Sequence, residues 1–343
     1  MNIEPELKRR VELARAWLLS MTTNGGLCRN LHVTSGERGA VSSEITGYGA
    51  HLFAWLFAVE QRHEDRMTAR AFGKWLATQW HDAGGYLPYE TETDLTFFFD
   101  IGIAARGLYA VAKSTQSTEY WDMAITLASQ MTRFRIGEGV YRAALLGGTG
   151  DWAPDPRPFK NWWSWVPGPH QRKAALAWKA VKRFGEYDDV DTAWVLWSPA
   201  EEPGKRATRQ EHETAADLLH PLAYSCEALL ISEASQYRAY RDIAILQSKI
   251  NSGPDFLRCD VLAQYLRLHL LQGLPLPMGM LDRLLDMQHE SGGFYFRIGP
   301  KGKPGPDLSV HATIFAIQLM VLAQDLVRCN WPGPLGRREL AIV

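Results

Sequence analysis

Six polar side chains stand at the starts of apolar, helix-like segments, where they could carry acid–base chemistry. They are Glu44, Asp100, Arg172, His220, Asp260 and His311. Capping explains carboxylates at helix N-termini, because free N–H groups and the helix dipole favour negative charge there. It does not explain a cation there, which opposes the dipole. The arginine and the two histidines therefore indicate a binding or catalytic site, with the carboxylates and histidines as acid–base candidates.

A second set of polar residues lies one helical turn further along three of these segments. Tyr48 follows Glu44, Tyr224 follows His220 and Gln264 follows Asp260, each at a spacing of four. Residues four apart share one helix face, so each of these side chains lies beside the first polar residue of its segment. We expect this face to line a cavity and to contact a substrate.

Tryptophans gather in one irregular stretch, the insert at residues 147–170. Three of them, Trp162, Trp163 and Trp165, are nearly consecutive in a segment that is also rich in proline. Long loops in compact domains are often functional. We expect these indole rings to stack against a ligand or to cover a pocket.

The segments that carry these residues follow a helical repeat. Amphipathic helices are expected at 5–22, 65–83, 118–134, 188–198, 235–250 and 278–290. More apolar helices follow them at 43–60, 99–113, 170–184, 217–233, 258–272 and 309–326. Short β-ribbons are expected only at 84–91, 139–146 and 292–299. Six such pairs predict two concentric rings of helices, whose parallel inner members begin at one mouth.

No linker rich in serine, glycine or proline divides the chain. Residues 1–343 are therefore predicted to form a single domain, with a loosely packed tail at 328–343.

Composition narrows the class of protein. The formal net charge is −1, so we expect neither a nucleic-acid nor a membrane partner. The first 21 residues mix charged and apolar residues, unlike a signal peptide, and the four cysteines are far apart. A cytoplasmic location with free thiols is expected. No metal or cofactor is predicted, because Glu211, His212, Glu213 and His220 lack a known ligand spacing.

Two sequence motifs add a family resemblance. The pattern Q-x-x-x-GG-F spans Gln288 to Phe294, and Gln79 to Tyr86 reads as a looser copy, QWHDAGGY. With the six helix pairs, these motifs resemble the (α/α)6 toroid superfamily. This superfamily includes six-hairpin glycosidases, uronate lyases, sugar epimerases and terpenoid cyclases. The resemblance covers residues 5–326 and implies an all-α (α/α)6 toroid.

The expected function is that of a carbohydrate-active enzyme: a glycoside hydrolase, a uronate lyase or a sugar epimerase acting on a poly- or oligosaccharide. Arg172 would hold a substrate carboxylate or phosphate, and the tryptophans would stack on sugar rings. One alternative is a terpenoid cyclase or prenyl-binding relative. Asp189, Asp191 and Thr192 resemble part of the acidic DxDDTA segment of such cyclases, although one aspartate is missing. A non-catalytic glycan-binding or scaffold protein is the other alternative.

Overall fold

The computed structural model describes most of the chain. The described residues are 3–91, 93–137, 140–147, 149–151, 164, 170–181, 215–232, 236–251, 257–299 and 302–327. None of the helices within these ranges is both long and apolar enough to cross a membrane.

Eleven α-helices lie in the described residues. They are α1 (Glu4–Ser20), α2 (Ser43–Glu60), α3 (His63–Asp82), α4 (Phe98–Thr115), α5 (Thr118–Gln130), α6 (Gln171–Val181), α7 (Ala215–Ser232), α8 (Gln236–Asn251), α9 (Cys259–Leu271), α10 (Met278–Leu285) and α11 (Val310–Val327). They match eleven of the twelve predicted helices. The predicted segment 118–134 ends in a 3₁₀ turn (Met131–Phe134), and the segment 278–290 stops at Leu285. The twelfth, at 188–198, lies outside the described residues.

Burial separates the helices into the two predicted kinds. Every residue of α9 is buried, as is every residue of α2 from Ser43 to Leu56. In contrast, α3 buries one face, which includes Ala69, Phe72 and Leu76, and exposes the other. The hydrophobic pattern of the sequence therefore distinguishes the fully covered helices from those that border solvent.

Contacts between residues divide the chain into two compact units. The first unit comprises Met1–Ala40, Ala215–Ile231 and Gln236–Val343. The second comprises Val41–Thr214 with Ser232–Ser235. Because the first unit contains both α1 and α11, the two ends of the helical series belong to the same unit.

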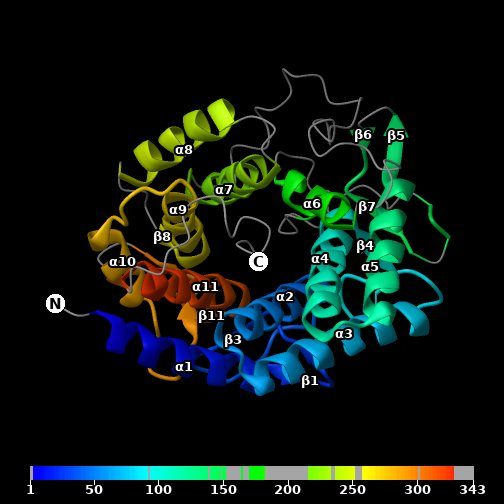
Figure 1. Ribbon diagram of the computed structural model, residues 1–343, viewed down its shortest axis with the longest axis horizontal. Helices are drawn as coiled ribbons and strands as arrows, with labels where there is room; N and C mark the ends of the chain where they lie inside the picture. Colours follow the sequence, from blue (N-terminus) through cyan, green and yellow to red (C-terminus); the bar gives the residue numbers. More distant parts are fainter. Residues whose placement is uncertain are drawn as a thin grey trace. The chain divides into compact units, whose positions relative to one another are not determined.

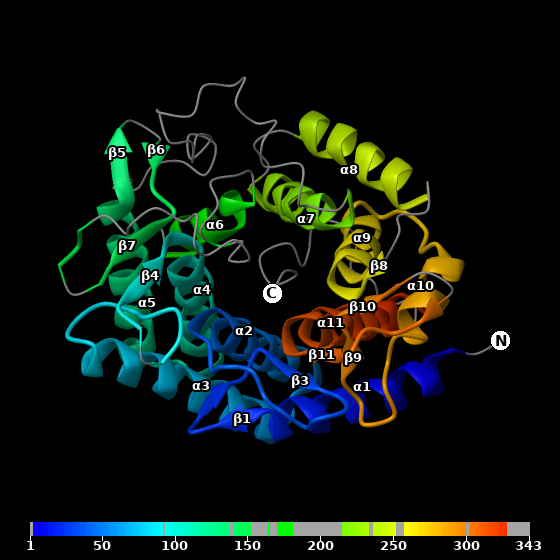
Figure 2. The same ribbon diagram turned by 180° about the vertical axis from the view of Figure 1, so that it is seen from behind.

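In the second unit, α4 packs between α2 and α6, and α3 and α5 lie outside them (Figures 1 and 2). Glycines permit the close approach of the covered helices. A Cβ on Gly107 would lie 2.4 Å from the carbonyl oxygen of Gly47, and one on Gly102 would lie 2.6 Å from that of Ala174. The strands of this unit are β4 (Leu95–Phe97), β5 (Arg135–Gly137), β6 (Val140–Tyr141) and β7 (Ala144–Leu146), paired antiparallel as β4–β7 and β5–β6.

In the first unit, α7, α9 and α11 are neighbours, and α8, α10 and α1 lie outside them (Figures 1 and 2). Its strands are β1 (Thr22–Thr23), β2 (Gly26–Leu27), β3 (Asn30–His32), β8 (Leu257–Arg258), β9 (Phe294–Tyr295), β10 (Arg297–Ile298) and β11 (Asp307–Ser309). All pair antiparallel, in the orders β1-β2, β3-β11-β9 and β8-β10. Strands β8 and β11 lead directly into α9 and α11, so they set where these helices begin.

The ribbon predictions are confirmed at two of three places. Residues 139–146 contain β6 and β7, and residues 292–299 contain β9 and β10. Within 84–91, however, Glu90 forms only an isolated bridge with Ser42. Pro88 interrupts that segment and cannot donate a ladder hydrogen bond. The strand forms after it instead, as β4.

The Q-x-x-x-GG-F motif has a structural role between α10 and α1. The Gln288 amide donates hydrogen bonds to the carbonyl oxygens of Arg10 and Gly292, both at 3.0 Å. Gly292 has φ 104°, and a Cβ there would lie 2.2 Å from the carbonyl oxygen of Leu13. Glycine is therefore required for this turn to pack against α1.

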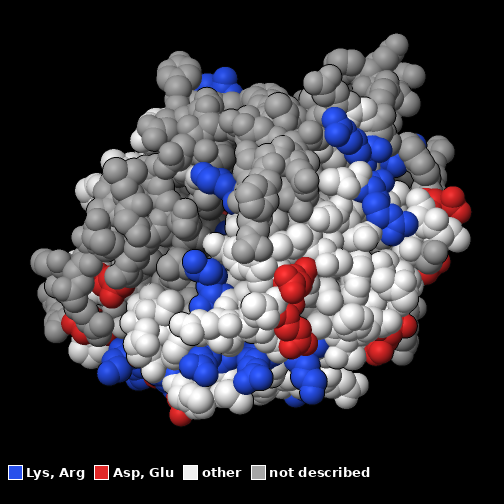
Figure 3. Space-filling model, turned by 45° about the vertical axis from the view of Figure 1, so that its right-hand side comes forward, with Lys and Arg blue, Asp and Glu red and all other residues white. Residues whose placement is uncertain are grey.

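Exposed charges of both signs appear on the face shown in Figure 3. This mixture agrees with the net charge of −1.

Candidate active site in the first unit

Three covered helices of the first unit present faces with identical spacing, polar at every position except Phe315. Each face uses positions i, i+4 and i+7, which lie on one side of a helix. The faces are His220, Tyr224 and Glu227 on α7; Asp260, Gln264 and Arg267 on α9; and His311, Phe315 and Gln318 on α11. First members contact first members and third members contact third members. The three helices therefore run in the same direction, as the sequence predicted for inner helices.

We call the contacts among the first members of the three faces the first level, and those among the third members the third level. Asp260 is the centre of the first level. It is fully buried in the first turn of α9, where its Oδ1 accepts the Val261 N–H at 2.8 Å. Arg258, the last residue of β8, donates to both carboxylate oxygens, with Nε–Oδ1 3.0 Å and Nη2–Oδ2 2.6 Å. Burial by itself raises the pKa of Asp260, but the charge and the hydrogen bonds of Arg258 hold it well below its usual value. Asp260 is thus held as an anion.

Arg258 is positioned by the β8–β10 pair. The N–H of Cys259, the next residue, donates to the carbonyl oxygen of Phe296 at 3.0 Å. The guanidinium lies over the Phe296 ring, 4.7 Å from its centroid. This packing fixes the arginine before it reaches Asp260.

His220 is held between Asp260 and Gln264. Its Nδ1 lies 2.9 Å from Gln264 Oε1 and 3.3 Å from Asp260 Oδ2. Both neighbours are acceptors, so Nδ1 carries the proton and the lone pair of the neutral ring is on Nε2. Burial lowers the pKa of His220 well below its usual value and outweighs the attraction of Asp260. His220 is therefore a neutral imidazole at neutral pH.

His311 links Asp260 to a tyrosine. It is the second residue of α11, its Nδ1 lies 3.6 Å from Asp260 Oδ2, and its Nε2 is hydrogen-bonded to the Tyr224 hydroxyl at 2.6 Å. The His220 and His311 rings are nearly perpendicular, with centroids 5.4 Å apart. Two imidazoles thus adjoin one carboxylate, and a phenol is bonded to one of these imidazoles; all three groups can carry a proton.

The third level is an ion pair in the core of the unit. Arg267 Nη2 donates to Glu227 Oε1 at 2.5 Å, and its Nη1 donates to Gln318 Oε1 at 2.7 Å. The guanidinium also lies over the Phe315 ring, 4.2 Å from its centroid. Gln264 joins this level to the first, because its amide nitrogen donates to Glu227 Oε2 at 3.1 Å.

The first level also has the composition of a metal site. His220, Asp260 and His311 each offer one ligand atom, and these atoms lie within 4.8 Å of one another. However, Arg258 already contacts both oxygens of Asp260. A divalent ion would have to share this carboxylate with a guanidinium, so the charges present do not favour a metal here.

Of the twelve residues predicted to form the site, the structure brings five together. These are His220, Tyr224, Asp260, Gln264 and His311. Glu44, Tyr48, Asp100 and Arg172 are buried in the second unit, where the ammonium of Lys173 lies 5.2 Å from the Tyr48 ring centroid. Trp162, Trp163 and Trp165 lie outside the described residues, as do Asp189, Asp191 and Thr192.

One prediction about position is wrong. His220 does not open its helix, because α7 begins at Ala215 and includes Pro221 in its interior. The sequence interpretation took the polar residue before an apolar run as the helix start, but the helix begins five residues earlier. The other five residues do lie at the second or third position of their helices.

Sequence reasoning missed Arg258, Glu227, Arg267 and Gln318. The last three follow the same face of each helix by one further turn, so extending the periodic reading would have found them. Arg258 precedes its helix, and its role depends on β10, which the sequence does not place beside it.

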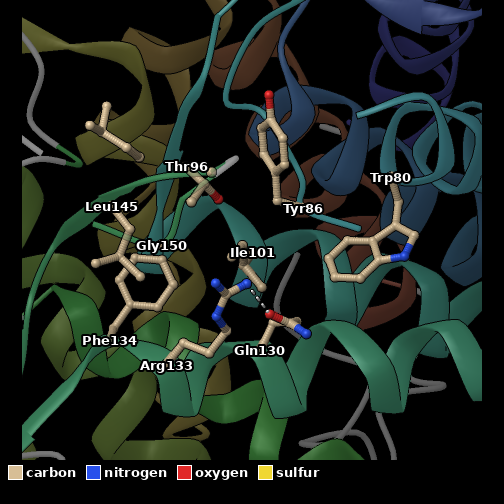
Figure 4. A pocket seen from close by; sticks show the side chains of 11 residues that line it. Trp80, Tyr86, Thr96, Ile101, Gln130, Arg133, Phe134, Leu145 and Gly150 are labelled. Atoms are coloured by element: carbon tan, nitrogen blue, oxygen red, sulfur yellow. Dashed lines mark hydrogen bonds between the residues drawn. The ribbon is translucent and has the colours of Figure 1, made fainter. Parts of the chain in front are cut away.

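A separate small pocket lies in the second unit, beside β4, β7 and the end of α5 (Figure 4). Trp80, Tyr86, Thr96 and Arg133 are among its lining residues. The buried Thr96 hydroxyl has no hydrogen-bond partner within the described part of the chain. The volume of the pocket is about 10 Å³, room for about one water molecule. In this conformation the pocket is too small for a sugar.

No protein-family model matches the chain, and no curated protein matches it in sequence. Solved structures do match its fold. A cellobiose 2-epimerase from Bacillus thermoamylovorans covers 94% of this chain and 100% of its own, with a TM-score of 0.69 and 12% identity. A D-mannose isomerase covers 93% and 97%, with a TM-score of 0.63 and 9% identity.

A type II terpene cyclase from Scytonema covers 94% of this chain and 98% of its own, with a TM-score of 0.59 and 14% identity. The fold class predicted from the sequence, an all-α (α/α)6 toroid, is therefore confirmed. At these identities the similarity establishes the fold alone, because one fold hosts many chemistries.

Proposed function

We propose that this chain is a carbohydrate-active enzyme that transfers a proton at the carbon next to the carbonyl of an open-chain sugar. Sugar epimerases and aldose–ketose isomerases share this step. The observation that carries the proposal is the imidazole pair, His220 and His311, beside the single carboxylate of Asp260. A cellobiose 2-epimerase and a D-mannose isomerase among the similar folds support it.

Each residue has a distinct role in this proposal. His220, neutral with its lone pair on Nε2, is the base that removes the proton from carbon. His311 returns a proton, and the Tyr224 hydroxyl bonded to its Nε2 exchanges protons with it. Asp260 orients the rings and stabilises whichever imidazolium forms, the role of the carboxylate in other His–Asp pairs. Arg258 keeps Asp260 ionised.

Glycoside hydrolysis has less support from this geometry. It needs a protonated carboxylic acid together with a second carboxylate. The two carboxylates on these three helix faces, Asp260 and Glu227, are each ion-paired with an arginine. Such a carboxylate is a poor proton donor, so the histidines are the better proton carriers. The same reasoning excludes Asp260 as the acid of a terpenoid cyclase, which must protonate an alkene.

Solvent exchange tests the proposal whichever reducing sugar is the substrate. The protein is incubated in D₂O with neutral and acidic reducing mono- and disaccharides, and NMR follows the proton on C2. We expect deuterium incorporation and a new epimer or ketose. His220→Gln and His311→Gln should each slow exchange by about 10²- to 10⁴-fold. His289→Gln is the matched control, because His289 contacts Ser291 outside the cluster.

Three results would contradict the proposal. Absence of exchange across the whole panel would remove the isomerase and epimerase assignment and favour a non-catalytic role. Glycosidic cleavage without exchange at C2 would indicate a hydrolase or lyase. Exchange at the wild-type rate in both histidine variants would place the chemistry elsewhere in the chain.

A further inference from the structure

The basic nitrogen of His220 is selected by hydrogen bonds that begin two helical turns away. We propose that Glu227 is a positioning residue that fixes the tautomer of His220 through the side-chain amide of Gln264. This inference rests on the proposed function only in its use of His220 as the base. The tautomer itself follows from contacts among α7, α9 and α11.

The chain of contacts begins at Arg267. This arginine is fully buried and can only donate hydrogen bonds, so its pairing makes Glu227 an acceptor at both oxygens. Glu227 Oε2 then receives the amide nitrogen of Gln264 at 3.1 Å. The carboxylate cannot donate in return, so the Gln264 amide has one permitted orientation.

The fixed amide determines the state of His220. With its nitrogen toward Glu227, Gln264 presents Oε1 to His220 Nδ1 at 2.9 Å. An amide oxygen only accepts, so Nδ1 must carry the proton and Nε2 must carry the lone pair. Glu227, Gln264 and His220 are each at most 2% exposed, which excludes competition from bulk water.

Glu227→Gln should reverse the orientation of the Gln264 amide. The new amide must turn its oxygen toward the charged donor Arg267, so its NH₂ faces Gln264. The Gln264 amide then rotates, presents its own NH₂ to His220 Nδ1, and moves the ring proton to Nε2. Asp260 Oδ2, 3.3 Å from Nδ1, opposes this change. Because the rotated Gln264 amide favours Nε2–H while Asp260 favours Nδ1–H, we expect the Nε2–H tautomer to become the major form, with some Nδ1–H remaining.

The test is long-range ¹H–¹⁵N NMR of the full chain labelled at histidine, which distinguishes the two tautomers. His220→Gln assigns the His220 signals among the ten histidines. The wild type should show Nδ1–H alone, and Glu227→Gln should show mainly Nε2–H. Gln318→Met is the matched control, because it removes a hydrogen bond from Arg267 without touching Gln264. It should leave the tautomer unchanged.

A second variant covers the case in which Glu227→Gln does not fold. Glu227→Met/Arg267→Met replaces the ion pair with apolar side chains, a change that buried pairs often tolerate. It frees the Gln264 amide to turn, so both tautomers should appear. Pure Nδ1–H in a folded Glu227→Gln protein, or in this double variant, would overturn the proposal by showing that Asp260 alone sets the tautomer.

Turnover separates this inference from the proposed function. If the wild type exchanges deuterium at C2, Glu227→Gln should lower kcat by about 10²- to 10⁴-fold with little change in KM. If no sugar exchanges, the proposed function fails, while the NMR spectra still decide the tautomer.

Discussion

Arg258→Met should be one of the most destabilising single changes at the site. Arg258 makes two charge-assisted hydrogen bonds to Asp260, whose side chain is 0% exposed, and is itself 12% exposed. Methionine retains much of the packing volume but leaves a buried carboxylate without its cation. Breaking such a pair costs about 3–5 kcal/mol. Val261 N–H and His220 still contact Asp260, so we expect about 3 kcal/mol.

The assay is urea denaturation combined with a double-mutant cycle. Asp260→Asn should cost less than Arg258→Met, because the partly exposed arginine can turn to water whereas the carboxylate cannot. The coupling energy between the two changes should exceed about 1.5 kcal/mol. Loss of Arg258 should also raise the pKa of His220, since its charge helps to lower that pKa. NMR titration measures that shift.

A matched control uses a surface pair with similar geometry. Arg9 also contacts a carboxylate, Glu6, at 2.8 Å, but the two side chains are 59% and 42% exposed. Arg9→Met should therefore leave stability unchanged within error. A cost below about 1 kcal/mol for Arg258→Met, or a coupling energy near zero, would refute the buried ion pair and with it the ionised state of Asp260.

Two further predictions concern packing and pH. Gly107→Ala should destabilise the protein by about 1–2 kcal/mol because its methyl group would overlap the Gly47 carbonyl. Gly279→Ala, whose methyl group would meet nothing within 4 Å, should stabilise α10 slightly. Urea midpoints of the two variants that move in the same direction would contradict this pair of predictions. Because the pKa of His220 is lowered in the fold, the unfolded chain binds more protons than the folded chain at pH values near and just below 6.5, the usual pKa of histidine. Stability should therefore fall as the pH drops below about 6.5. Thermal melts of His220→Gln should show a shallower fall, and a wild-type stability that rises on acidification from that pH would show that His220 is not neutral in the fold.

The sequence alone determined the helices and their burial. The spacing of apolar residues predicted α9 as one of the more apolar helices and α3 as an amphipathic helix. In the structure α9 is fully buried and α3 buries one face. This prediction succeeds because helical periodicity is a local property of a few turns. The sequence also placed Asp260 and His311 at helix starts, where the structure has them.

The tertiary structure decided which of these residues meet. Glu44 and Asp100 were as plausible as Asp260 in sequence, yet they belong to the second unit, whereas Asp260 lies beside two histidines. His220 meets Asp260 from the second turn of α7, although the sequence placed this residue at the helix start. These outcomes depend on the rotation and axial position of one helix against another.

The ionisation states of the site residues were also decided by the tertiary structure. Periodicity can place Asp260, Glu227 and Arg267 on helix faces, but the sequence does not reveal that Arg258 pairs with Asp260 or Arg267 with Glu227 inside the unit. A pKa depends on burial and on charges a few ångströms away, and those neighbours come from distant parts of the chain. Periodicity along the chain therefore predicts the helices, and packing between them determines which side chain can carry a proton.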